Sequence, residues 1–274
     1  MNGFLSFPTG STGCSLRAYG VVQATAETLP NLRKQPGSVG GASTPANLLN
    51  HADDQTVVAV ASVLRAIGDF QLHETTFADW GVIGSPRFAG RVRCAAALEK
   101  FYRLGPLSVS PLLIPFLSLH AVSSMISLAL RIHGPALGVG GGKGDFVQAL
   151  LMGLALQQQE DLPGVWVVMT GWHPEPVGEC GAATVTTPVC QAVALALLPD
   201  TACVHGPRLR LVPADGHEAR GHDSPTLPDL VQIFSNSPAV NESRTWNCPL
   251  PGGWRLELNV GNVVQETLGL ARSA

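Results

Sequence analysis

The chain has 274 residues, which is enough for one large domain with a sizeable buried core. Only 14% of the residues are charged and the formal net charge is −3, so the sequence predicts no basic face for nucleic-acid phosphates. None of the six cysteines forms a C-x-x-C pair, which argues against zinc-ribbon and thioredoxin sites.

Strand-like and helix-like segments alternate from residue 17 to residue 200. Strands are expected, in chain order, at residues 17–25, 78–85, 136–140, 164–172 and 189–199. Helices are expected at residues 53–70, 90–105 and 114–134, and a further helix starts at Asp145, a good N-cap with Gln148 three positions later. Residues 35–50 form a Gly/Ser/Pro-rich loop with the composition of a mobile segment. The alternation predicts an α/β domain over residues 1–200, with a mixed, mostly buried sheet covered by helices.

The pattern weakens after residue 200. Strand-like segments at residues 204–215 and 252–260 are separated by a polar, proline-containing stretch at 216–230, and residues 262–274 are predicted to be a terminal helix. Residues 201–274 are therefore expected to form a C-terminal extension, either within the same domain or as a short appendage.

Neither a membrane span nor a signal peptide is predicted. The longest apolar stretch, residues 106–130, is interrupted by prolines, serines and a histidine, which favours a buried helix over a span of about 20 apolar residues. The N-terminal residues lack the basic and apolar regions of a signal peptide, so we expect a cytoplasmic protein with reduced thiols.

A glycine-rich stretch at residues 138–144 lies between an apolar strand and an apolar helix, where phosphate-binding loops occur. In a P-loop the first glycine would fall on Leu137 and the magnesium-binding hydroxyl on Gly144, so two functional positions fail. A dinucleotide fingerprint starting at Gly138 fails as well, because its third glycine falls on Lys143. No nucleotide or other cofactor is predicted, and the glycines by themselves are compatible with a tight strand-to-helix turn.

The histidines predict no metal site. In "HEARGH" the second histidine, His222, stands five residues after His217, whereas the zinc motif H-E-x-x-H needs four to place both on one helix face. A solvated loop is the better interpretation of this stretch.

Several motifs occur in the order and spacing of the β-ketoacyl synthases, the condensing enzymes of the thiolase superfamily. "SPLLIPFLSLHAVSSMISLALRIHGP" resembles the segment before the active site of that family, with its Ser-Pro, Ile-Pro, small-residue and Gly-Pro positions. "WGVIGSPRFAG" resembles the family's Gly-Val-Ile strand and the loop after it, and "GVWVVMTGWHPEP" resembles the strand after the nucleophile helix. The resemblance covers residues 55–200 and implies an α/β fold with the N-terminal lobe of the thiolase superfamily.

The main departure from the family concerns the nucleophile. The condensing enzymes use a cysteine thiolate at a helix N-terminus as the acyl acceptor. The resemblance places that position at Lys143, Gly142 or Gly141, depending on the motif used for alignment, and no cysteine lies between Cys94 and Cys180. No catalytic residue is assigned, and a Schiff base on Lys143 is the chemical alternative. The family's catalytic histidines are not transferred to any histidine of this chain.

The resemblance therefore implies a non-catalytic partner subunit, of the chain-length-factor type, in fatty-acid or polyketide-type biosynthesis. Its implied partners are a full-length ketosynthase or a second copy in a dimer, with acyl carrier protein as a further partner. Candidate substrate-binding residues are Ser123, Ser124, Arg87 and Phe88, for which helix packing and a solvated surface are the alternatives. The rival functions are an acyl-thioester-processing enzyme that uses a different residue, and a stand-alone ligand-binding or scaffold protein.

Overall fold

The structure of the chain is a computed structural model. It describes residues 12–36, 38–39, 42–43, 47–73, 75–111, 113–140, 145–159, 162–177, 187–200, 207–214, 226–235 and 244–260. The predicted terminal helix at 262–274 and the glycine-rich residues 141–144 lie outside these described residues.

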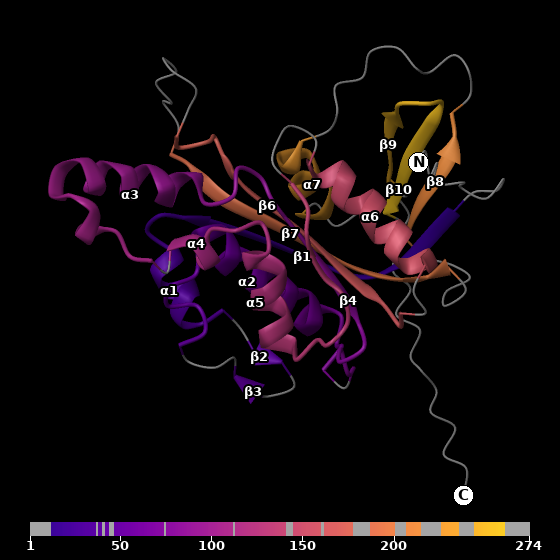
Figure 1. The fold of residues 1–274 in the computed structure, drawn as a ribbon. Helices are drawn as coiled ribbons and strands as arrows, with labels where there is room; N and C mark the ends of the chain where they lie inside the picture. The colour runs from indigo at the N-terminus through magenta and orange to yellow at the C-terminus, as the bar shows by residue number, and fades with distance from the viewer. Residues whose placement is uncertain are drawn as a thin grey trace, which may run out of the picture.

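An eight-stranded mixed sheet runs through the structure in the order β5-β4-β6-β7-β1-β8-β10-β9 (Figure 1). Its strands are β1 (Thr12–Thr25), β4 (Gly81–Pro86), β5 (Ala136–Gly138), β6 (Val165–His173), β7 (Val189–Pro199), β8 (Arg208–Pro213), β9 (Arg244–Leu250) and β10 (Trp254–Val260). β4 pairs in parallel with both β5 and β6, and all other neighbours in this sheet pair antiparallel. The carboxyl ends of β4, β5 and β6 therefore lie at the same end of the sheet. A separate pair is formed by β2 (Ser38–Val39) and β3 (Ala42–Ser43).

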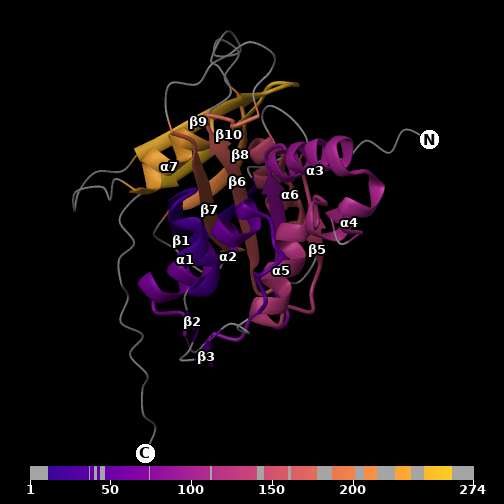
Figure 2. The ribbon, with the colours of Figure 1, turned by 90° about the vertical axis from the view of Figure 1, so that its left-hand side faces the viewer.

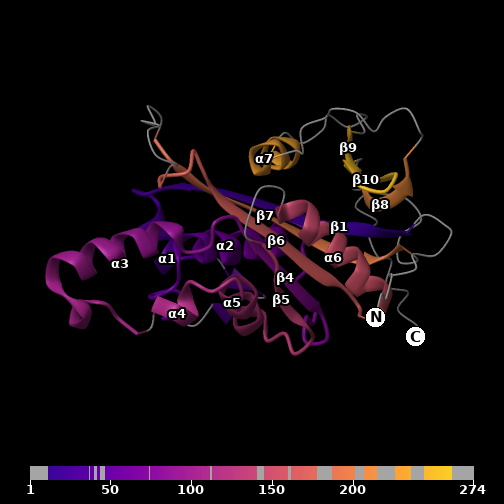
Figure 3. The same ribbon diagram turned by 45° about the horizontal axis from the view of Figure 1, so that its top comes forward.

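Helices cover both faces of the sheet, so the architecture has three layers (Figure 3). The helical elements are α1 (Leu29–Lys34), α2 (Asp54–Asp69), α3 (Arg91–Leu104), the 3-10 turn η1 (Pro106–Ser108), α4 (Leu113–Phe116), α5 (Ala121–Leu130), α6 (Asp145–Gln159) and α7 (Leu227–Ser235). Helices α2 and α5 pack on one face, and α6 and α7 pack on the other. This is the layered α/β fold that the alternation of segments predicts.

The side chains of β6 show how the sheet divides the core. Trp166 and Val168 belong to the cluster on the α2 side, whereas Val165, Val167 and Met169 belong to the cluster on the α6 side. Successive residues of a strand point to opposite faces, so a continuous apolar run is required where both faces are covered. All five side chains are buried, which explains why this segment contains no charged residue.

Helix α2 is the central helix of its face. Its N-cap, Asp53, accepts a hydrogen bond from the backbone N–H of Gln55 at 3.2 Å, as an N-cap carboxylate does. The helix lies directly on β1 at Gly20, where a Cβ atom would come within 2.0 Å of the carbonyl oxygen of Ser62. Close contact between strand and helix therefore depends on the missing side chain at this position.

The apolar segment predicted as one helix over residues 114–134 is two helices, which corrects that expectation. The four-residue α4 ends at Phe116 and α5 begins at Ala121. The hydroxyl of Ser118 donates to the carbonyl of Pro115 at 3.2 Å, and the N–H of Ala121 donates to the carbonyl of Ser118 at 3.0 Å. These local bonds form a turn in place of continuous helix. Within the described ranges, no helix combines the length and apolarity needed to cross a membrane.

Candidate functional site

The end of the sheet where β4, β5 and β6 finish carries most of the predicted site residues. The chain leaves β5 at Gly138 and enters α6 at Asp145, so the connection at residues 139–144 starts at this end of the sheet. Gly141, Gly142 and Lys143 fall within that connection but outside the described residues, so their predicted equivalence to the family's nucleophile position stays a prediction.

Ser123 and Ser124 lie in the first turn of α5, against β4. Ser123 is completely buried and its hydroxyl donates to the carbonyl of His120 at 3.2 Å, while Ser124 is exposed. At Gly84 of β4 a Cβ atom would come within 2.9 Å of the backbone nitrogen of Ser123. The small residues at this contact bring the helix directly onto the strand. Their predicted substrate-binding role stays a prediction.

Arg87 and Phe88 follow β4 and form the entry to α3. The N–H of Arg87 donates to the carbonyl of Thr170 at 2.8 Å, which continues the β4–β6 pairing by one residue. Phe88 has a φ of 50°, in the left-handed region, and this turns the chain towards α3. The guanidinium carbons of Arg87 and Arg91 lie 5.1 and 4.9 Å from the centre of the Phe88 ring, within the range of cation–π contacts.

Beneath this turn lies a buried group of polar residues that sequence analysis did not single out. The side-chain amide of Gln55 donates to the carbonyl of Arg87 at 2.9 Å and its oxygen accepts from the Thr170 hydroxyl at 2.9 Å. Gln55 and Thr170 are both almost completely buried. The Gln55 amide therefore connects three elements: α2, the residue that follows β4, and β6. These bonds fix the position of the turn at Arg87 and Phe88.

Glu175, just after β6, faces the same turn. Both of its carboxylate oxygens are buried. Burial raises the pKa of Glu175, and the positive charges of Arg91 and Arg87 and the backbone N–H of Val177 oppose that rise. In the sequence, Glu175 is the acidic residue of the segment "GVWVVMTGWHPEP". The rule that functional groups gather at the carboxyl ends of parallel strands could have selected it.

Asp53 is the second buried acid of this region. Burial raises its pKa, as does the neighbouring Asp54, while the N–H of Gln55 and the charge of Arg93 act in the opposite direction. The described residues contain no group of three or more histidine, cysteine or acidic side chains that could hold a metal ion. The arrangement holds two acids of raised pKa, Glu175 near Arg91 and Arg87, and Asp53 near Arg93.

Replacing Asp53 with asparagine is expected to change how stability depends on pH. Because the pKa of Asp53 is raised in the folded state, its carboxyl stays protonated to a higher pH there than in the unfolded state. The free energy of unfolding therefore falls as the pH rises from about 4 through the native pKa. Asparagine caps a helix as well as aspartate does but carries no charge. Urea unfolding should show the variant gaining stability over the wild type between pH 4 and pH 7.

The matched variant is Asp53→Ala, which removes both the charge and the cap. It should lose about 1 kcal/mol relative to Asp53→Asn at every pH. A difference between Asp53→Asn and wild type that does not vary with pH would contradict a raised pKa at Asp53.

Comparison with known proteins identifies the fold. No family model and no curated protein sequence matches the chain. Among solved structures, "The ishigamide ketosynthase/chain length factor" has a TM-score of 0.50 at 15% identity, covering 76% of this chain and 69% of that chain. The complex of the ketosynthase ApeO with its chain length factor ApeC from Xenorhabdus doucetiae has a TM-score of 0.52 at 15% identity, covering 91% of this chain and 97% of the matched chain.

A β-ketoacyl synthase from Burkholderia phymatum has a TM-score of 0.50 at 14% identity, over 82% of this chain and 69% of that one. The fold is that of the ketosynthases. The fold expected from the sequence motifs is therefore confirmed. Within this ketosynthase fold, β8, β10 and β9 extend the sheet beyond β1, so the described part of residues 201–274 contributes strands to the same sheet.

Proposed function

We propose that this chain is a non-catalytic partner subunit for a full-length ketosynthase in fatty-acid or polyketide-type biosynthesis. The proposal is carried by the ketosynthase fold together with the lack of a cysteine in the segment where the sequence resemblance places the nucleophile of the condensing enzymes. No cysteine occurs between Cys94 and Cys180, and that interval contains the whole connection from β5 to α6. The likeness to a chain of a ketosynthase–chain length factor complex, over 97% of that chain, supports the same role.

The surface of α3 supports a partner. This helix projects beyond the sheet, and none of its residues is buried (Figure 1). Leu98, Phe101, Tyr102 and Leu104 share one side of the helix at three- and four-residue spacings, and all four are exposed. An amphipathic helix normally buries such a face. Contiguous exposed apolar surface is typical of protein interfaces, so this face is the one we assign to the partner.

The opposite side of α3 suits an acidic protein. Arg93, Lys100 and Arg103 share that side, and Glu99 forms an ion pair with Arg103 at 3.5 Å. Basic residues steer an acidic partner towards the side of the helix that carries them. This is the basis on which acyl carrier protein is kept as a further partner, with Arg87 and Arg91 at the root of the helix as its phosphate-binding candidates.

The chemical part of the proposal is tested by mass spectrometry. The purified chain, incubated with acyl thioesters of acyl carrier protein, should carry no stable acyl adduct on residues 138–145, because no thiolate is available there. The exposed Cys94 should first be replaced by serine, since an exposed thiol can be acylated without catalysis. A complete ketosynthase treated in parallel is the positive control. A stoichiometric adduct on any residue from 138 to 145 would favour the enzyme alternative.

A further inference from the structure

One long edge of β1 is covered along only part of its length. β7 pairs with β1 from Cys14 to Thr25, but on the other side β8 pairs only with residues 12–15. Beyond that point the N–H of Leu16 donates to the carbonyl of Pro207 at 2.9 Å, and β8 contributes no further pairs. Among the described residues, no strand pairs with the second half of β1 on this side, which is therefore a sheet edge.

The hydrogen bonds identify which backbone groups face this edge. Arg65 of α2 donates from Nη1 to the backbone carbonyl of Val21 at 3.1 Å. This carbonyl therefore points away from β7. In an antiparallel pair the N–H and C=O of one residue point to the same side, and residues two apart point alike. Val21 and Gln23 therefore present their backbone groups to the edge. Among the described residues, the N–H of Val21 and both backbone groups of Gln23 have no hydrogen-bond partner.

The edge is closed at one end by a turn. The N–H of Thr25 donates to the hydroxyl of Thr28 at 2.9 Å, and the N–H of Thr28 donates to the carbonyl of Thr25 at 3.0 Å. At the other end Tyr19 contacts Phe70 and Phe234, with ring centres 4.9 Å apart in each pair. The open section thus has defined limits and is centred on residues 21–23.

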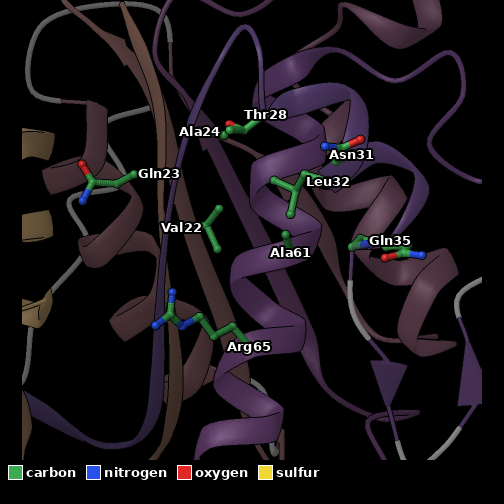
Figure 4. Close-up of a pocket in the computed structure, with 10 residues that line it drawn as sticks. Val22, Gln23, Ala24, Thr28, Asn31, Leu32, Gln35, Ala61 and Arg65 are labelled. Atoms are coloured by element: carbon green, nitrogen blue, oxygen red, sulfur yellow. The ribbon is translucent and has the colours of Figure 1, made fainter.

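A groove of about 540 Å³ follows this open section. β1 forms one wall with Val22 and Gln23, α1 forms the opposite wall with Asn31 and Leu32, and α2 forms the floor with Ala61 and Arg65 (Figure 4). Figure 2 shows α1 and α2 beside β1 from a second direction. Its volume lies in the range of sites that hold small ligands or a few residues of a peptide.

We propose that this groove binds an extended peptide segment, which adds a strand to β1 along Val21–Gln23. The backbone groups at the edge are the donors and acceptors that strand addition uses. Natural proteins usually block such edges with charges, prolines or covering segments. Here the blocking contact is the guanidinium of Arg65 on the carbonyl of Val21, and this N–H donor takes the place that a peptide N–H would occupy.

The lining defines the chemistry of the peptide. The apolar side chains of Val22, Leu32 and Ala61 suit one apolar or β-branched side chain of the ligand. Arg65 is the charged residue of the lining and 61% of its side chain is exposed, so an acidic residue of the peptide suits that end. Its present ion pair with Asp69, at 3.4 Å, is exposed and weak. Because α1 stands opposite the strand, the groove admits a single extended chain and not the edge of a second folded copy.

The test uses the full chain and a labelled peptide, acetyl-Thr-Val-Thr-Val-Glu-amide, at concentrations up to about 1 mM. Fluorescence anisotropy measures binding, and hydrogen exchange locates it. We expect saturable binding and slower exchange of the amides of Val21 and Gln23. Asn31→Trp places an indole in the groove from the exposed surface of α1 and should weaken binding about tenfold or more, which corresponds to about 1.4 kcal/mol.

The matched control is Lys34→Trp, an exposed position of the same short helix that does not line the groove. It should change the affinity less than about twofold. Absence of binding, protection of a different segment, or equal affinity of Asn31→Trp and wild type would each overturn the proposal. So would a dimer that forms without peptide and is lost in Asn31→Trp, because the edge would then serve self-association.

Discussion

Replacing both Leu98 and Tyr102 with glutamate is expected to abolish co-purification of the chain with its ketosynthase. The two side chains lie one turn apart on the apolar side of α3 and are 56% and 82% exposed. In the proposed complex they would be covered by the partner, and an unpaired carboxylate in such a place costs several kcal/mol. We expect the affinity to fall about 100-fold or more. The measurement is co-expression with the ketosynthase encoded nearest to this chain, followed by size-exclusion chromatography with light scattering.

The control for this experiment is Leu128→Glu on α5, where the side chain is 63% exposed. It introduces the same carboxylate on another surface and should leave co-purification intact. Because all three positions are exposed, each variant alone should unfold within a few degrees of the wild type. A double variant that still binds would exclude α3 from the interface. If the wild-type chain stays monomeric when it is co-expressed with each ketosynthase encoded near it, the partner proposal is wrong. The scaffold or ligand-binding alternative would then be favoured.

The elements predicted well from the sequence are those whose own residues determine them. β7 occurs at Val189–Pro199, as predicted, because both of its faces are covered and a mostly apolar run is required, in which Gln191 is the buried polar residue. Helix α2 occurs at Asp54–Asp69, where the apolar residues recur at the helical period and Asp53 caps the N-terminus. The prediction was wrong at α7. This helix begins at Leu227, inside the stretch at residues 216–230 that was predicted to be a polar loop because of its average polarity. Its buried residues, Leu227, Leu230, Val231 and Phe234, have helical spacing, so a shorter window would have found it.

The candidate site could be predicted only in part. Arg87 and Phe88 stand next to a recognisable strand, so their position followed from the motif. The hydrogen bond between Gln55 and Thr170 joins residues 115 positions apart, and only the packing of α2 on β6 brings them together. No local pattern encodes such a contact. The β1 groove was unpredictable for the same reason, because an uncovered edge depends on where β8 stops.

Replacing Gly20 with alanine is expected to destabilise the fold strongly. The added Cβ would lie 2.0 Å from the carbonyl oxygen of Ser62 and 2.8 Å from the backbone nitrogen of Ala66. Both contacts are with the backbone of α2, so no side-chain rotation can relieve them, and the helix has to move away from β1. Overpacking of this kind costs about 3 kcal/mol or more, a large part of a total stability of about 5–15 kcal/mol. Urea and thermal unfolding of the purified variant measure the loss.

The matched control is Gly68→Ala, the same substitution within α2 itself. No atom lies within 4 Å of the Cβ that this substitution would add, so it meets no steric cost. Alanine also has the higher helix propensity, and the variant should gain up to about 1 kcal/mol. Opposite signs at the two glycines would show that the cost at Gly20 comes from the strand–helix contact. A Gly20→Ala protein as stable as the wild type would mean that α2 does not rest on β1 at that point, and the placement of Asp53 and Gln55 in the candidate site would need revision.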